Sequence, residues 1–265
     1  MIMTNEQIRF LENIAANAYV ALEDQQYDGW ELRFTHGFTG RANAVQLKKP
    51  STIALPEKVE YCEKAYADHG LPCIFKLTDA DRDFITFLEQ RGYQAVKPTD
   101  VMTLALSDEN TDYDTAAVLE NVIFSDTPDD WFAPYFEYEG LTDEDKQDMT
   151  RKIHAKVSVQ KVYIKVMEQA RVAAVASLAI ESGYSLLHNV VVDPALRGKG
   201  LGKKLCLAAI LKAKQCGATQ MYLQVMQNNP VALSLYQKLG FEKQYTYYYV
   251  MNHAKEFRKN VETAI

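Results

Sequence analysis

Hydrophobic residues recur along much of the chain at helical spacing. Ile8 and Leu11 lie one turn apart behind Thr4, a residue type that caps helices, and Gln7 occupies the partner position of a capping box. These residues predict a helix over 4–22. The same kinds of signal predict further helices over 57–69, 80–91, 200–216 and 230–239, and a helical region interrupted by prolines over 112–155.

Other stretches alternate hydrophobic and polar residues, or are rich in β-branched and aromatic residues, as strands are. They predict strands over 30–34, 42–47, 72–77, 101–106, 161–168, 171–180, 185–192, 221–226 and 245–251. The consecutive strands between 161 and 192 are joined by short connections, which favour antiparallel pairing. The chain is therefore predicted to be of the α/β (α+β) class.

A strand, helix, glycine and strand follow one another twice, which indicates an internal repeat. FLEQRGYQ at 87–94 aligns with LYQKLGFE at 235–242, and the strands on either side align as well. The polar, acidic segment 107–112 has the residues of a turn and lies between the two copies. We therefore expect one domain over 1–110, a second over 111–253, and a short amphipathic tail helix over 254–265.

The two copies differ where chemistry is expected. Asp81 and Leu88 of the first copy stand where Asn229 and Tyr236 stand in the second. The first copy also has no counterpart of the glycine-rich turn described below, and its nearest glycine cluster, HGFTGRAN at 36–43, has a different spacing. The functional site is therefore expected in the second half.

Composition excludes several classes of protein. The 265 residues carry a formal net charge of −6, whereas proteins that bind nucleic acid are normally basic. The longest weakly polar run, 172–180, is too short to span a bilayer, and the first residues, MIMTNEQIRF, do not resemble a signal peptide. The four cysteines lack the spacing of zinc or redox motifs. We expect a cytoplasmic protein with reduced thiols, no metal, and no nucleic-acid or membrane partner.

A local basic cluster lies in VVVDPALRGKGLGKKL, residues 190–205, where a predicted strand gives way to a helix. The helix dipole disfavours positive charge at this end, so the arrangement indicates a bound anion. The alternate glycines Gly198, Gly200 and Gly202 let backbone N–H groups form an anion-binding concavity that suits a pyrophosphate. A Rossmann motif would need glycine at Lys203, and a Walker loop is absent. A glycine-rich helix entry without a ligand is the alternative.

Two motifs of this half resemble those of the GCN5-related N-acetyltransferases, the GNAT family. The spacing of Arg197, Gly200 and Gly202 resembles motif A of that family. One strand later, a second motif is matched by Asn229, Ala232, Leu235, Tyr236, Lys238, Gly240 and Phe241. Two motifs in the expected order and at the expected separation are more specific than either one alone.

The close resemblance covers about 160–252, and the first half of the chain is similar to the degenerate half-domain of tandem GNAT proteins. It implies a mixed, mostly antiparallel sheet flanked by helices, with a second, partial GNAT-like domain. In the family, acetyl-CoA lies where two parallel strands splay apart, here 185–192 and 221–226. The residues implied in holding its pantetheine arm and pyrophosphate are Val190, Val191, Val192, Arg197, Gly198, Lys199, Gly200, Leu201, Gly202, Lys203 and Asn229.

Catalytic roles follow less directly. Tyr236 matches the family's proton donor to the leaving thiolate; a core aromatic residue on an amphipathic helix is the alternative. The attacking amine must be neutral, so a base has to take its proton. His188, on the cofactor strand, and Glu137 are the candidate bases, with Glu139 and Glu181 as further ones. For His188, a histidine that is simply packed in its strand is the alternative.

Aromatic and acidic residues interleave in WFAPYFEYEG, residues 131–140. This pattern suits a cationic amine bound near Trp131, Tyr135 and Glu137, and it suits equally a helix with a packed aromatic face. Asn229 likewise has two interpretations, a cofactor contact and a helix N-cap.

The resemblance implies transfer of an acetyl group from acetyl-CoA to a primary amine by direct attack in a ternary complex. The sequence does not name the amine, which is a small molecule or a peptide, and it leaves open whether the protein forms a homodimer. Two other functions stay open: a non-catalytic sensor of CoA or acyl-CoA, and a nucleotide-dependent oxidoreductase.

Overall fold

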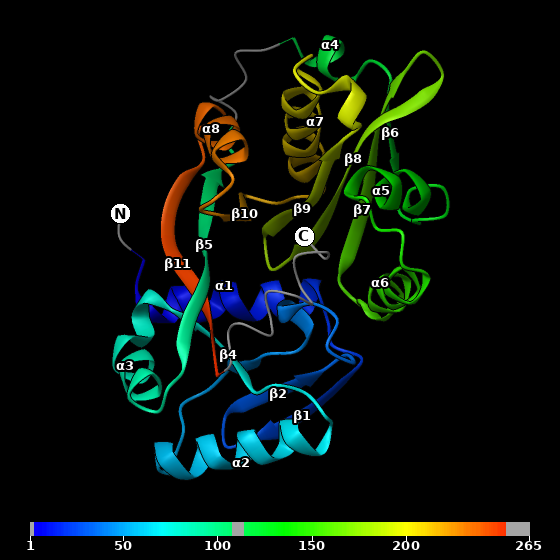
Figure 1. Cartoon of the computed structure of the whole chain (residues 1–265). Helices are drawn as coiled ribbons and strands as arrows, with labels where there is room; N and C mark the ends of the chain where they lie inside the picture. Colours follow the sequence, from blue (N-terminus) through cyan, green and yellow to red (C-terminus); the bar gives the residue numbers. More distant parts are fainter. Residues whose placement is uncertain (1–2, 108–113, 253–265) are drawn as a thin grey trace. The chain divides into compact units, whose positions relative to one another are not determined.

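A computed structural model describes residues 3–107 and 114–252 (Figure 1). Contacts divide these residues into two compact units. Unit 1 comprises 3–100, 144–157 and 245–252, and unit 2 comprises 101–107, 114–143 and 158–244. The predicted tail helix over 254–265 and most of the polar segment 107–112 lie outside the described residues.

Unit 1 contains the long helices α1, α2 and α6 and a sheet with the strand order β1-β2-β3-β4-β11-β5. Strands β3 and β4 are parallel, and the β1–β2, β2–β3 and β4–β11 pairs are antiparallel. Its elements are α1 (Asn5–Ala18), β1 (Glu23–Tyr27), β2 (Trp30–Phe34), η1 (Gly40–Ala42), β3 (Val45–Leu47), α2 (Leu55–Asp68), β4 (Ile74–Thr78), η2 (Asp79–Asp81), α3 (Arg82–Gln90), α6 (Glu144–Lys156) and parts of β5 (Gln94–Ala105) and β11 (Glu242–Met251).

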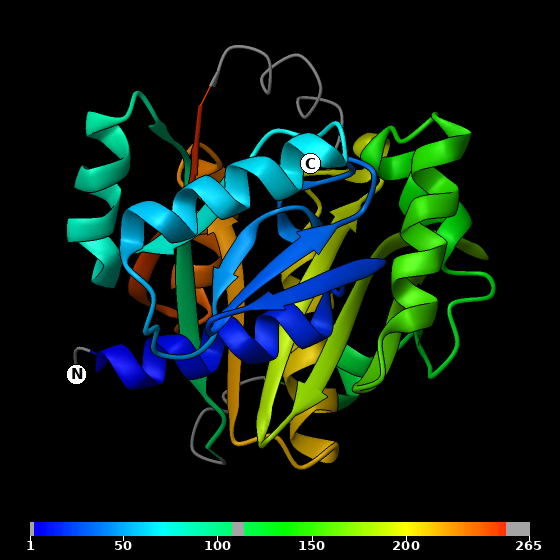
Figure 2. The ribbon, with the colours of Figure 1, turned by 90° about the horizontal axis from the view of Figure 1, so that it is seen from below.

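Helices α1 and α2 lie on opposite sides of this sheet, with α2 in front of β1 and β2 in Figure 2. The face under α2 and α3 is apolar and holds buried Trp30, Leu32, Phe75 and Leu88. The alternate residues of the same strands are polar and reach α1. Lys76 of β4 pairs with Glu12 of α1 at 2.6 Å, so this face is buried through ionic and hydrogen-bonded contacts.

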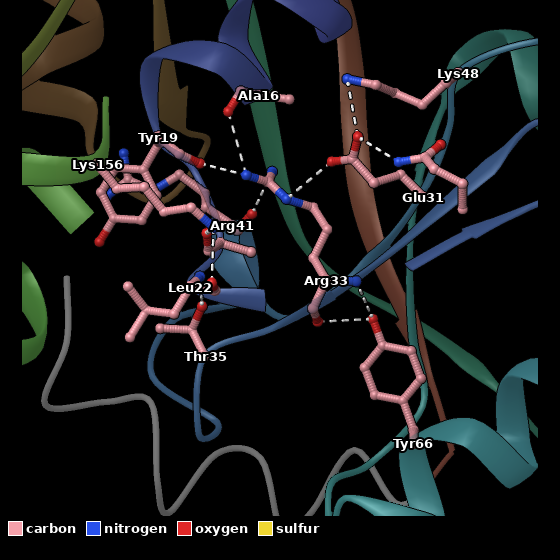
Figure 3. A network of polar contacts seen from close by, with 12 residues as sticks. Ala16, Tyr19, Leu22, Glu31, Arg33, Thr35, Arg41, Lys48, Tyr66 and Lys156 are labelled. Carbon is pink, nitrogen blue, oxygen red and sulfur yellow. Dashed lines mark hydrogen bonds and ion pairs between the residues drawn. The ribbon is translucent and has the colours of Figure 1, made fainter. Parts of the chain in front are cut away.

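Arg33 of β2 donates hydrogen bonds to the carbonyl groups at the end of α1 (Figure 3). Its buried guanidinium donates to the carbonyl oxygens of Ala16 at 3.2 Å, Tyr19 at 2.6 Å and Arg41 at 2.9 Å, and it pairs with Glu31 at 3.3 Å. The last carbonyl groups of a helix have no partner within the helix, and α1 has no basic residue of its own in its last turn. A side chain from the sheet therefore caps this helix.

Replacing Lys76 with methionine is expected to destabilise the protein by about 3–5 kcal/mol, because Glu12 would keep a buried charge without its ion-pair partner. The two side chains are only 3% and 8% exposed, and the Tyr245 hydroxyl would still donate to Glu12 at 2.7 Å. Lys152→Met is the control: it breaks an exposed pair with Asp148 and should cost less than about 1 kcal/mol. Urea unfolding measures both, and similar losses would show that Glu12 does not depend on Lys76.

The compact units do not follow the predicted division at residue 110. Helix α6 lies between elements of unit 2 in sequence, yet Met149 and Ile153 pack with Tyr19 and Ala42 of unit 1. Lys156, at the end of α6, donates to the carbonyl oxygens of residues 21 and 22 in the same unit. As a division between two copies of a repeat, the boundary at 110 stays a prediction.

Unit 2 contains a sheet with the strand order β5-β10-β9-β8-β7-β6. The β7–β8 and β8–β9 pairs are antiparallel, as predicted for the consecutive strands between 161 and 192. The β6–β7 pair is also antiparallel, and β9 and β10 are parallel. Its elements are α4 (Thr115–Leu119), β6 (Val122–Ser125), α5 (Phe132–Glu139), β7 (Gln160–Glu168), β8 (Arg171–Glu181), β9 (Tyr184–Val192), η4 (Pro194–Leu196), α7 (Leu201–Gln215), β10 (Gln220–Met226), α8 (Pro230–Lys238) and parts of β5 and β11.

Helices pack on both faces of this sheet. The core on one side joins α7, through residues such as Leu205, to Ile164, Leu178 and Leu223. Cys206 of α7 is fully buried in this core, and burial raises the pKa of its thiol to about 12. On the other face, an aromatic cluster centred on α5 packs against β7, β8 and β9. Among the described residues, none of the helices combines the length and apolar character needed to cross a membrane.

Two strands were not predicted. Strand β1, Glu23–Tyr27, is mostly exposed and polar, so it has no hydrophobic alternation. Strand β6, Val122–Ser125, falls inside the helical region predicted over 112–155, and that prediction is wrong there. Both are short strands at the ends of the strand order, where one neighbouring strand supplies the backbone hydrogen bonds.

Candidate functional site

The parallel strands β9 and β10 separate part-way along their length. Their register pairs residues 184–187 with 220–223, and the last pair is Leu187 with Leu223. Both strands continue, β9 to Val192 and β10 to Met226. Past the last pair, the main chains of β9 and β10 no longer pair with each other. The sequence predicts that the pantetheine arm binds at this place.

A β-bulge turns β9 just past this point. The register with β8 shifts between the Val175–Val191 pair and the Ser177–His188 pair, and Asn189 has a φ of +54°. Asparagine is one of the few residue types that adopt this left-handed conformation readily. As a result, Val191 joins the aromatic cluster under α5, whereas Val190 and Val192 pack against the core that contains α7.

The side chain of Asn189 is held from two elements. Its amide nitrogen donates to Ser177 Oγ of β8 at 3.1 Å, and its amide oxygen accepts from the Tyr135 hydroxyl of α5 at 3.5 Å. Two other aromatic residues of this segment bond to β8: Trp131 Nε1 donates to the Ala176 carbonyl at 2.9 Å, and the Tyr138 hydroxyl donates to the Val172 carbonyl. These hydrogen bonds hold helix α5 and the residue before it against β8 and the bulge of β9.

The glycine-rich turn presents free space at the start of α7. Gly198 and Gly200 have φ angles of +81° and +82°, and a Cβ at either would meet no heavy atom within 4 Å. Gly200 is the N-cap of α7, and it makes no side-chain cap hydrogen bond to the first-turn N–H groups. Arg197, Lys199 and Lys203 are exposed beside the turn. N–H groups without a side-chain cap, open space and nearby positive charge fit a phosphate ligand.

The segment before this turn is anchored. Asp193 is buried, accepts from the Ala195 N–H at 2.8 Å and pairs with Arg171 of β8. After the turn, a Cβ at Gly202 would lie 3.8 Å from Val192, at the end of β9, and 3.5 Å from Leu235 of α8. The end of β9, the start of α7 and helix α8 therefore converge at Gly202.

Helix α8 carries Asn229 and Tyr236. The Asn229 side chain accepts from the Ala232 N–H at 3.1 Å, so it is an N-cap, with Pro230 behind it as predicted. Tyr236 is 8% exposed, lies edge-on to Phe241 and near Cys206, and its hydroxyl bonds to none of the described residues. Burial raises the pKa of Tyr236, so the hydroxyl stays protonated at neutral pH.

The candidate bases lie in different surroundings. His188 is buried and stands next to the bulge, opposite Ser177. Glu137 is exposed on α5, and Glu139 and Glu181 are half-buried. Trp131 is fully buried and stacks on Tyr135, so its ring belongs to a packed aromatic face.

Sequence reasoning missed three polar residues of this site: Asn189, Ser177 and Gln224. Gln224 follows the last β9–β10 pair on β10, directly after buried Leu223 and before buried Val225. A polar residue inside a hydrophobic strand was the available signal for Gln224. Asn189 carried no such signal, because the bulge appears only in the pairing with β8.

Comparison with known proteins decides the family. Residues 5–250 match the family described as "Probable histone acetyltransferase Rv0428c C-terminal". The chain belongs to the GNAT family. A Bacillus subtilis protein described as "Uncharacterized N-acetyltransferase YobR" is 29% identical over 242 residues, which cover 89% of this GNAT chain and 95% of YobR. A [ribosomal protein bS18]-alanine N-acetyltransferase of Haemophilus ducreyi is 34% identical over 80 residues, 30% of this chain and 55% of the relative.

Solved structures share the fold of this GNAT protein. A GCN5-related N-acetyltransferase from Kribbella flavida has a TM-score of 0.65 at 15% identity, covering 94% of this chain and 95% of that one. A tandem GNAT protein from the clavulanic acid biosynthesis pathway has a TM-score of 0.62 at 14% identity, with coverages of 91% and 86%. The predicted fold, a mixed and mostly antiparallel GNAT-type sheet flanked by helices in a tandem arrangement, is confirmed.

Proposed function

We propose that this GNAT protein transfers an acetyl group from acetyl-CoA to a primary amine, by direct attack in a ternary complex. The convergence at Gly202 carries the proposal. There the separated strand β9, the uncapped start of α7 and the helix that bears Tyr236 come within contact distance. One ligand with a diphosphate at one end and a thioester at the other would engage all three.

Groups of this chain suit two parts of such a ligand, the diphosphate and the pantetheine arm. The N–H groups from Gly198 to Lys203 would hold the diphosphate, and the positive side chains of Arg197 and Lys199 would neutralise it. The main chain at 190–192 would pair with the amides of the pantetheine arm as a neighbouring strand does. Acetyl-CoA supplies the activated acetyl group as a thioester.

The reaction needs one group that accepts a proton and one group that donates a proton. The incoming amine loses a proton as it bonds to the acetyl carbon, and His188 is the proposed acceptor of that proton. The departing sulfur gains a proton, and Tyr236 is the proposed donor, since burial keeps its hydroxyl protonated. Glu137, which is exposed, is the second candidate base.

Release of free thiol from acetyl-CoA in the presence of a panel of primary amines tests the proposal. Amine-dependent release, with the acetylated amine identified by mass spectrometry, would support it. Tight binding of CoA without turnover of any amine would favour the non-catalytic sensor. Protection against heat by a nicotinamide cofactor in place of acetyl-CoA would favour the oxidoreductase.

Replacing Tyr236 with phenylalanine is expected to lower kcat on the order of 100-fold, because the leaving thiolate would lose its proton donor. The KM for acetyl-CoA and the unfolding midpoint should change little, since the hydroxyl bonds to none of the described residues. Tyr163→Phe is the matched control: this buried tyrosine of unit 2 also has a raised pKa, about 12. Equal turnover by both variants would remove Tyr236 from the reaction.

A further inference from the structure

Two polar side chains occupy equivalent positions where β9 and β10 separate. The last pair is Leu187 with Leu223, so His188 and Gln224 are the next residues at the same register level. Leu223 and Leu187 belong to the core that contains α7. Successive residues of a strand point to opposite faces, so His188 and Gln224 both project from the face away from α7.

Gln224 carries an unsatisfied amide in this position. Its Nε2 is buried and has no hydrogen-bond partner among the described residues, although the strand residues on either side are buried and hydrophobic. A buried donor without an acceptor costs about 1–3 kcal/mol relative to a satisfied one. Such a group calls for an explanation, and a site that receives an acceptor atom from a ligand is one.

Another unsatisfied group of this strand pair lies elsewhere. Ser185 Oγ is also buried without a partner, but Ser185 pairs with Met221 inside the closed part of β9 and β10 and shares the face of Leu187. A ligand that enters between the separated strands would first meet the side chains just past the last pair. Gln224 lies just past the last pair, whereas Ser185 lies within the paired part.

We infer that Gln224 is a specificity-determining residue that contacts the acceptor substrate, donating a hydrogen bond to an oxygen close to the reacting amine. The inference rests on the proposed function. Paired strands lie about 5 Å apart, and His188 and Gln224 come one residue past the last pair, so an amine held between the separating strands beside His188 would have the Gln224 amide on its other side. The expected acceptor class is therefore an amine with a carbonyl oxygen next to the amino carbon, as at a peptide N-terminus.

Gln224→Met tests this with two matched amines, glycinamide, which has such an oxygen, and ethylamine, which has none. The wild type should prefer glycinamide, and Gln224→Met should lower kcat/KM for glycinamide about 10- to 100-fold, because the site would lose its donor. For ethylamine the change should stay below about 3-fold, since that amine has no oxygen for the donor to bind. Gln220→Met is the control: it makes the same substitution four residues earlier on the same face of β10, in the paired part.

Two further measurements separate binding of the acceptor from other roles. The affinity for acetyl-CoA, measured by calorimetry, should be unchanged in Gln224→Met. The urea midpoint of the ligand-free variant should equal or exceed that of the wild type, because an unsatisfied polar group is removed. A lower midpoint would instead show that Gln224 stabilises the fold.

The outcomes distinguish this inference from the proposed function. A wild type that acetylates both amines equally well, or a variant that loses both activities equally, refutes the role of Gln224 alone. A loss of acetyl-CoA affinity in Gln224→Met would assign the residue to the acyl donor and also refute it. A wild type that releases no thiol with any amine refutes both.

Discussion

Replacing Gly200 with glutamate is expected to abolish acetyl-CoA binding and leave the protein folded. The new carboxylate would project into the open space at the start of α7, where the proposed diphosphate lies. Like charges placed together at a binding interface cost several kcal/mol, and 1.4 kcal/mol is tenfold in affinity, so the loss should exceed about 100-fold. Titration calorimetry, or the loss of acetyl-CoA protection against heat, measures it.

Gly217→Glu is an unusually close control. Gly217 follows the other end of the same helix, has the same φ of +82°, and a Cβ there would also meet nothing within 4 Å. Both variants should lose roughly 1–2 kcal/mol of stability, because a side chain disfavours the left-handed conformation. Only Gly200→Glu should lose acetyl-CoA. If both bind it, or if both fail to bind it, the turn at Gly200 is not the diphosphate site.

The first half of the chain is not expected to fold alone when the gene is divided at residue 110. A fragment of residues 1–110 keeps the first strands and α1 to α3 of unit 1 but lacks α6 and β11. It would expose Tyr19 and Ala42, which pack with Ile153, and the edge of β4, which pairs with Tyr247–Met251. It would also leave Glu12 without the Tyr245 hydroxyl. Circular dichroism and urea titration should show no cooperative transition.

The control is to cleave the folded protein near residue 110, so that both fragments stay in the sample. A protease site placed within 108–113, cleaved after the intact protein has folded, keeps every element of unit 1 in the sample. The cleaved protein should retain its cooperative transition, because every described element of both units stays in the sample. A fragment of residues 1–110 that unfolds cooperatively by itself would show that it folds without α6 and β11 and would support the predicted boundary at residue 110.

The elements with a periodic hydrophobic pattern were predictable. The Thr4 capping box, the helix that Asn229 caps and the antiparallel strands from 160 to 192 all appear as the sequence indicates. Their signals are local, within four residues along the chain. Helix α6 shows the limit: its residues predict a helix, but which core receives Ile153 depends on Tyr19 and Ala42, more than a hundred residues earlier.

The candidate site also contains some residues that the sequence indicates and others that only the structure shows. Two spaced motifs mark Gly200, Tyr236 and Asn229 as candidate site residues, and their roles stay predictions. The bulge at Asn189 was not predictable, since it exists only in the pairing with β8, two residues against one. The unsatisfied amide of Gln224 was equally hidden, because a sequence states that a residue is polar and does not state what surrounds it.

The two tryptophans of the chain are divided between the units. Trp30 is 3% exposed under the Lys58 ammonium group in unit 1, and Trp131 is fully buried in unit 2, its indole N–H bonded to the Ala176 carbonyl. Each indole therefore supplies an intrinsic fluorescence signal that belongs to a single unit. A single-tryptophan variant would follow the melting of one unit optically, with the other unit silent.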